Sequence, residues 1–189
     1  MFTIVRILGL LILDLAVTLG TGLGIGSGSG KALPPAPAAS PADANANASA
    51  AYQKLTALAG RWEADSKMGK VTTTFEVISG GSAVLERFET AGMPPMVTVY
   101  HLDGSRLVLE HYCHAGNQPT LQARPFQAES NEIDFDFVSA TNLSSPQAGH
   151  MHQLAVNIQS ADRFSENWIW SENGKVGARN VALDYHRVQ

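Results

Sequence analysis

Short segments with alternating apolar and polar residues follow one another through most of this chain. Alternation with a period of two is typical of strands that have one face in a core and one in water. The connections between segments are short and hold turn residues, as in Asp103-Gly104 and Asn173-Gly174. The segments expected to be strands are 61–67, 70–78, 83–90, 96–102, 106–113, 120–128, 132–138, 150–158, 163–170 and 180–188.

One segment before the first strand has a helical period instead. Residues 51–60 place Tyr52, Leu55 and Leu58 on one helix face, and Gly60 is a natural helix stop. A short helix followed by short antiparallel strands predicts an all-β sandwich or barrel. Hairpin-length connections favour a meander, and a closed sheet leaves no exposed edges. We therefore predict an antiparallel up-and-down β-barrel of eight to ten strands over residues 51–189.

The first fifty residues do not have the pattern of a folded domain. In residues 1–26, Arg6 precedes a long apolar run, which is the layout of an export signal. The run is interrupted by Asp14, yet it approaches the ~20 residues that span a bilayer. A cleaved signal peptide is the first expectation and an uncleaved membrane anchor the second. Either predicts an exported protein, which is periplasmic or secreted, or tethered to the membrane through residues 1–26.

The next segment, residues 27–50, is rich in Ala, Pro, Ser and Asn and has almost no large apolar residue. Such a composition buries too little apolar surface to offset the entropy of ordering. We predict that it is a disordered linker.

Charge and cysteine content exclude several classes of function. The formal net charge is −4 without a basic cluster, so no nucleic-acid partner is expected. The single cysteine, Cys113, allows no intramolecular disulfide. Motifs such as CxxC, HExxH and GxSxG are absent from the sequence, so no enzyme class is indicated. No feature points to an oligomer.

Strand parity predicts which polar side chains point into the barrel. In segment 150–158, His150 and His152 share the face of Leu154, and in segment 163–170, Trp168 and Trp170 share one face. We expect the two histidines near one mouth of the barrel and the two tryptophans in a pocket wall. Glu166, on the tryptophan face, is expected to be a buried or mouth carboxylate.

The stretch around Cys113 also divides between two faces. His111 and Cys113 share the apolar, inward face of segment 106–113 with Leu107 and Leu109. His114 is expected to point outward or to begin a turn that ends at Pro119.

The hairpin before this stretch sets its expected neighbours. A two-residue turn at Asp103-Gly104 places Tyr100 opposite Leu107, with its side chain on the inward face. The candidate pocket residues are therefore Tyr100, His111, Cys113, His150, His152, Trp168 and Trp170.

Three chemistries are open to these residues. His111, Cys113, His150 and His152 share the expected inward parity and are the candidate ligands for a metal such as zinc. The alternative is that these side chains are hydrogen-bonded core or rim groups without a ligand. A nucleophilic Cys113 is disfavoured, because His111 lies too far along an extended strand for an immediate hydrogen bond. We assign no catalytic residue.

The residues Gly60-Arg61-Trp62, after a short helix and on the first strand, resemble the start of the calycin group of barrels. That group includes lipocalins, fatty-acid-binding proteins and nitrobindin-like haem barrels. The resemblance extends in outline over residues 51–189 and to small exported bacterial lipocalin-like proteins. It implies that Arg187, near the end of the last strand, packs across Trp62 and closes the barrel.

A barrel of this strand number can enclose an apolar ligand, and Tyr100, Trp168 and Trp170 would give it aromatic walls. Binding of a small hydrophobic or amphipathic molecule inside the barrel, without catalysis and without a cofactor, is the leading expectation. The first alternative is haem or metal binding, with His150, His152 and His186 as haem ligand candidates. The second alternative is a cofactor-free enzyme that acts on a bound small molecule.

Overall fold

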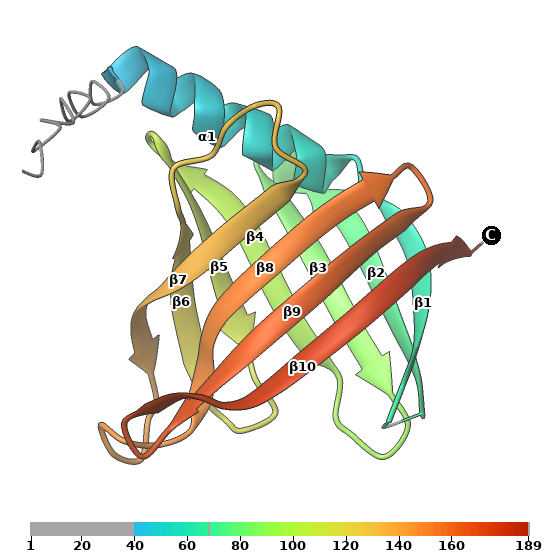
Figure 1. The fold of residues 1–189 in the computed structure, drawn as a ribbon, viewed down its shortest axis with the longest axis vertical. Helices are drawn as coiled ribbons and strands as arrows, with labels where there is room; N and C mark the ends of the chain where they lie inside the picture. The colour runs from blue at the N-terminus through green and yellow to red at the C-terminus, as the bar shows by residue number, and fades with distance from the viewer. Residues whose placement is uncertain (1–39, 68, 189) are drawn as a thin grey trace, which may run out of the picture. The chain divides into compact units, whose positions relative to one another are not determined.

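Ten β-strands follow one α-helix in the computed structural model, which describes residues 40–67 and 69–188. The predicted strands are all present (Figure 1), but β6 ends at Ala123 instead of residue 128 and β10 begins at Lys175 instead of residue 180. The elements are α1 (Pro41–Thr56), β1 (Gly60–Ser66), β2 (Gly69–Ile78), the 3-10 turn η1 (Ser79–Gly81), β3 (Ala83–Thr90), β4 (Met96–Asp103), β5 (Arg106–Tyr112), β6 (Gln118–Ala123), β7 (Glu132–Thr141), β8 (His150–Ser160), β9 (Arg163–Glu172) and β10 (Lys175–Val188).

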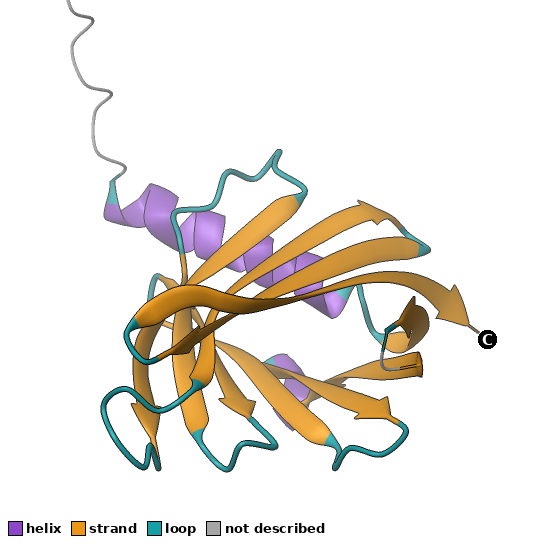
Figure 2. Ribbon diagram, turned by 60° about the horizontal axis from the view of Figure 1, so that its bottom comes forward, coloured by secondary structure: helices purple, strands orange, loops and turns teal. Residues whose placement is uncertain are grey.

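The strands form one closed antiparallel barrel in which every strand pairs with its neighbours in sequence (Figure 2). The circle is completed where β1 pairs with β10. The predicted up-and-down barrel is therefore confirmed. The order is that of a meander, as the short connections indicated.

The hairpin between β4 and β5 differs from the predicted one in register. Tyr100 lies opposite Leu109, not Leu107, and Thr98 lies opposite His111. The reason is that β4 extends to Asp103, so Gly104 and Ser105 form the turn. A shift of two positions keeps every side chain on its predicted face, because the side-chain period of a strand is two.

The segment after β5 also departs from the expected turn. β6 begins at Gln118, so Pro119 lies in a strand rather than at the end of a turn. The reversal is closed earlier, by hydrogen bonds between Cys113 and the backbone of Gly116 and Asn117.

Helix α1 begins ten residues earlier than the sequence pattern indicated. Ser40 caps it: its side chain accepts a hydrogen bond from the Asp43 backbone, and Asp43 accepts one from the Ser40 backbone. The prediction of a disordered linker is therefore wrong for residues 41–50. The rest of that linker and the predicted signal or anchor, residues 1–39, lie outside the described residues. Among the residues described, no helix is both long and apolar enough to cross a membrane.

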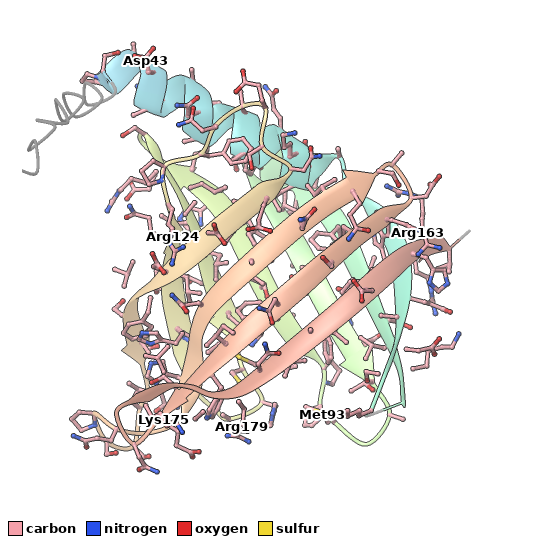
Figure 3. All side chains as sticks on the ribbon, in the orientation of Figure 1. Asp43, Met93, Arg124, Arg163, Lys175 and Arg179 are labelled. Atoms are coloured by element: carbon pink, nitrogen blue, oxygen red, sulfur yellow. The ribbon has the colours of Figure 1, made fainter. Side chains whose placement is uncertain are left out.

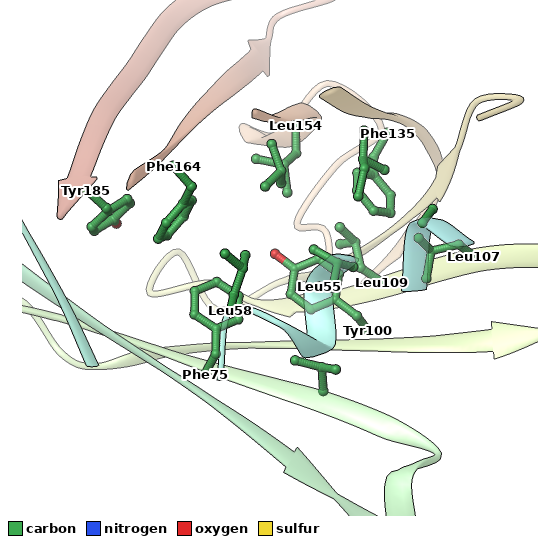
Figure 4. Packing of buried hydrophobic residues seen from close by; sticks show 14 of the residues in the cluster. Leu55, Leu58, Phe75, Tyr100, Leu107, Leu109, Phe135, Leu154, Phe164 and Tyr185 are labelled. Carbon is green, nitrogen blue, oxygen red and sulfur yellow. The ribbon is translucent and has the colours of Figure 1, made fainter. Parts of the chain in front are cut away.

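The helix covers one end of the barrel (Figure 1). Ala51, Tyr52 and Leu55 face the interior, and the Tyr52 hydroxyl donates to the Gly81 carbonyl at 2.8 Å. Beneath them, aromatic side chains from β1, β2, β9 and β10 fill this half of the barrel (Figure 4). Phe164 meets Trp62 edge-on at 4.8 Å and stacks on Tyr185 at 4.6 Å. These side chains form the main hydrophobic core of the barrel.

Arg187 lies across Trp62 at the closing seam. Its guanidinium is 4.1 Å from the Trp62 ring centre and donates to the carbonyls of Ala59 at 2.8 Å and Ala161 at 2.9 Å. Gly60 makes room for it: its φ is +132°, and a Cβ here would come within 2.6 Å of Arg187 Nη1. The predicted contact of Arg187 with Trp62 is thus present, and a glycine is required beside it.

A cavity with two buried carboxyls

A cavity of about 330 Å³ opens at the end of the barrel away from α1. Met93 and Arg179, two residues of its rim, are labelled at this end in Figure 3. Most of the wall is apolar or aromatic. The lining residues are Glu86, Phe88, Met93, Met96, Thr98, His111, His114, Ala115, Met151, Trp168, Trp170, Arg179, Val181 and Leu183.

Glu86 is a buried carboxyl that lines the cavity and is held by several hydrogen bonds. It is 2 % exposed, and the Tyr100 hydroxyl donates to its Oε2 at 2.9 Å while Thr73 Oγ1 lies 3.0 Å from its Oε1. Burial raises the pKa of the Glu86 carboxyl, and the hydroxyls of Tyr100, Thr73 and Thr98 oppose this by stabilising the ionised form.

Glu166, from β9, is a second buried carboxyl beside the first. It is 1 % exposed, and its Oε2 accepts a hydrogen bond from Trp168 Nε1 at 3.3 Å. Burial raises the pKa of Glu166 well above its usual range, and the charge of Glu86 raises it further. Of the two carboxyls, Glu166 is therefore the one that holds a proton more firmly, because more hydroxyl donors serve Glu86.

His111 stands in the same wall as Glu86. Its Nδ1 lies 3.0 Å from Thr98 Oγ1, and its ring packs on Trp168 with 4.7 Å between ring centres. Burial lowers the pKa of His111 to about 4, so the imidazole is neutral at physiological pH. Its Nε2 is buried and has no hydrogen-bond partner among the described residues. A ligand in the cavity can supply that partner.

The rim of the cavity is aromatic and basic. The Arg179 guanidinium lies 4.5 Å from the Trp170 ring centre and 3.7 Å from the Glu172 carboxylate. Trp170 Nε1 is buried and unpartnered among the described residues, like His111 Nε2. His114, which was expected to point outward or lie in a turn, lies in the turn and borders the cavity from there.

Three of the seven predicted pocket residues line the cavity: His111, Trp168 and Trp170. Tyr100 points inward as predicted but lies below the floor, where it holds Glu86. Cys113 is buried between Met96 and Trp170 and is not a lining residue. Burial raises the pKa of the Cys113 thiol, so it is not an activated nucleophile.

His150 and His152 do not line the cavity, contrary to the predicted parity. The register of β8 against β9 shifts between Met151 and Gln153, which pair with Trp170 and Ile169. This irregularity adds one residue, so Met151 takes the inward position that alternation assigned to the histidines. The two imidazoles instead bond to each other, at 3.1 Å between Nε2 of His150 and Nδ1 of His152, and pack on Phe137.

The four candidate metal ligands are therefore separated: His111 lines the cavity, Cys113 is buried outside its lining, and His150 and His152 form this pair. Within residues 40–67 and 69–188, no group of three or more His, Cys, Asp or Glu side chains is placed to hold a metal ion. Of the three haem ligand candidates, His150 and His152 lie in that pair and His186 lies on the exposed side of β10; none lines the cavity.

Glu86 was not singled out from the sequence, although a signal was present. It shares the apolar face of β3 with Val84 and Phe88, so alternation already indicated that its side chain points inward. Met96 gave the same signal, because it shares the inward face of β4 with Thr98 and Tyr100. Met93 and Met151 gave none, because Met93 lies in a connection and Met151 depends on the irregularity in β8.

Comparison with known proteins supports the fold. No family model matches the chain, and no curated protein sequence matches it. Among solved structures, the crystal structure of Rv2717c from M. tuberculosis is similar, with a TM-score of 0.51 and 15% identity over 74% of this chain and 98% of that chain. The likeness shows the barrel fold. At this identity it carries no function from one protein to the other.

Proposed function

We propose that this protein binds a small amphipathic molecule in the cavity, without chemical conversion. The observation that carries the proposal is a mostly apolar cavity of about 330 Å³ whose wall holds two buried polar atoms, His111 Nε2 and Trp170 Nε1, without partners. That volume is at the lower end of the range for small-molecule sites. An apolar body would pack against the aromatic wall, and a polar group would supply a hydrogen-bond partner for His111 Nε2.

The proposal includes a family and a location. Gly60, Trp62 and Arg187 form the contact that the calycin resemblance implied, which supports a calycin-like barrel. Export to the periplasm or beyond rests on the signal-like layout of residues 1–26.

A fluorescent apolar molecule tests the proposal. Phenylnaphthylamine added to the full chain should bind with increased emission and should quench tryptophan fluorescence, because Trp168 and Trp170 line the site. Val181→Phe, which fills the cavity, should weaken binding. Ala182→Phe is the matched control, because the next residue of β10 points to the outer face. Absence of binding, or equal effects of the two variants, would refute the proposal.

Haem is a second candidate, favoured by one observation. His111 has a neutral imidazole whose Nε2 has no partner among the described residues, and it lies in a mostly apolar cavity. A histidine nitrogen in such a setting is a common axial ligand of haem iron. Haem addition should then produce a Soret band that His111→Ala abolishes and His150→Ala preserves. A spectrum equal to that of free haem removes this candidate.

A further inference from the structure

Two neighbouring carboxyls are buried without a positive partner among the described residues: Glu86, which lines the floor of the cavity, and Glu166 beside it. No ion pair among the described residues includes Glu86 or Glu166. Burying acids without a cation is costly, and such groups concentrate at functional sites. We propose that the cavity is selective for hydrophobic amines, with the ammonium group bound by Glu86 and the apolar body held by the tryptophan wall. This inference rests on the proposed function and names the ligand class.

The groups that face Glu86 leave it short of positive charge. Glu166 approaches it from β9, Tyr100 from β4 and Tyr185 from β10, and all three are acids. His111 is neutral because burial lowers its pKa to about 4. Arg179 lies at the rim, where it is engaged by Glu172 and by the Trp170 ring. Glu166, which holds its proton, stabilises an ionised Glu86 by a hydrogen bond but brings no positive charge. When Glu86 is ionised, the floor therefore lacks one positive charge, which an ammonium group supplies.

The hydrogen bonds at the floor favour a donor on the ligand. Tyr100 and Thr73 present hydroxyls to Glu86, and the Thr98 hydroxyl also stabilises its ionised form. When Thr98 gives its proton to Glu86, it accepts from His111 Nδ1–H, since the two atoms are 3.0 Å apart. His111 Nε2 is then a free acceptor in the wall. A ligand ammonium group has up to three N–H donors, which can bond to the Glu86 carboxylate and to His111 Nε2.

The wall above the floor suits the rest of such a ligand. Trp168 and Trp170 present π surfaces that attract a cation as well as an apolar body. Met96 and Met151 add polarisable, adaptable side chains. A carboxylic acid is the opposing class, because Arg179 could meet it at the rim, but its apolar end would then lie against the buried carboxyls of the floor.

Binding of an amine should release a proton. The ammonium ion enters charged, and the protonated fraction of Glu86 loses its proton to solvent, so the pair formed is ammonium and carboxylate. Because burial raises the pKa of Glu86, amine affinity should rise with pH until Glu86 is ionised in the free protein and then level off. The affinity of a neutral ligand of the same shape should not show this dependence on pH.

A matched set of ligands tests the inference on the full chain. Naphthylethylamine, naphthylethanol and naphthylacetic acid share one apolar body and differ in charge. Tryptophan quenching should show the amine binding at least about tenfold more tightly than the alcohol near pH 7, with the acid weakest. Titration calorimetry in two buffers of different ionisation enthalpy should show proton release with the amine and none with the alcohol.

Substitution of the floor residue locates the effect. Glu86→Gln should bring the amine to the affinity of the alcohol, whereas Glu89→Gln, the same change on the exposed side of β3, should leave the preference intact. The proton-release experiment needs no variant, so the inference stays testable if Glu86→Gln does not fold.

The outcomes separate this inference from the proposed function. Equal binding of amine and alcohol, or a preference for the acid, overturns amine selectivity while small-molecule binding stands. Failure of all three ligands and of phenylnaphthylamine overturns both.

Discussion

Glu166 shows how one buried carboxyl couples the fold to pH. Its pKa is raised by burial and by the charge of Glu86, so between the unfolded pKa of about 4.3 and its folded pKa the native state binds more protons than the unfolded state. Its contribution to stability is therefore fully present below that unfolded pKa and is lost as pH rises. The glutamine side chain of Glu166→Gln does not titrate, so the variant should not lose this part of its free energy of unfolding as pH rises. Each pKa unit between the two states corresponds to about 1.4 kcal/mol.

Urea unfolding of both proteins from about pH 5 to about pH 8 measures the effect. The advantage of Glu166→Gln should grow with pH. Glu172→Gln, on the exposed end of the same strand, should keep the wild-type slope. Parallel curves for wild type and Glu166→Gln would mean that the carboxyl is already ionised in the folded protein.

Arg187 is a single residue that stabilises the seam between β1 and β10, at the end of the barrel opposite the cavity. Arg187→Ala removes its stacking on Trp62 and its hydrogen bonds to Ala59 and Ala161. We expect a loss of roughly 2–3 kcal/mol in the free energy of unfolding. Arg187→Lys should recover only part of it, because an ammonium group cannot stack and fork as a guanidinium does. Arg163→Ala, on the surface at the same end (Figure 3), should change stability little; an equal loss there would show that the seam contact has no special role.

At the scale of elements, α1 stabilises the barrel by sealing its end. Leu55 is fully buried between the helix and the strands, so Leu55→Ala should cost about 2–4 kcal/mol, measured by urea unfolding. Gln53→Ala, on the exposed side of α1, should be nearly neutral. A small effect of Leu55→Ala would indicate that the helix lies on the barrel without contributing to its stability.

At the scale of the whole molecule, closure joins all ten strands into one sheet, and we expect one cooperative transition. Trp62 reports on the end under α1, and Trp168 and Trp170 report on the cavity end. In a variant that keeps only Trp62 and in one that lacks only Trp62, urea transitions by fluorescence should each coincide with far-UV circular dichroism. Fluorescence of the cavity tryptophans that changes at lower urea would reveal a separately unfolding half.

The sequence by itself determined the positions of the strand segments, their meander order and most of their inward faces. These depend on local properties: the period of two, the turn residues between strands and the glycine before Trp62. Even the error in the β4–β5 hairpin kept Tyr100 and His111 on their predicted faces, because it was a shift of two residues.

The tertiary structure alone decided the exchange of Met151 for His150 and His152 at the cavity and the meeting of the two carboxyls. The start of α1 was instead a local signal that composition did not show, because Ser40, Pro41 and Asp43 form the N-terminal cap of a helix whose first residues are exposed. The irregularity in β8 has no marker in the sequence. Glu86 and Glu166 each lie on an inward face, yet they become neighbours only because the sheet closes and places β3 across the interior from β9. Their shared burial is a property of the closed barrel and not of either strand.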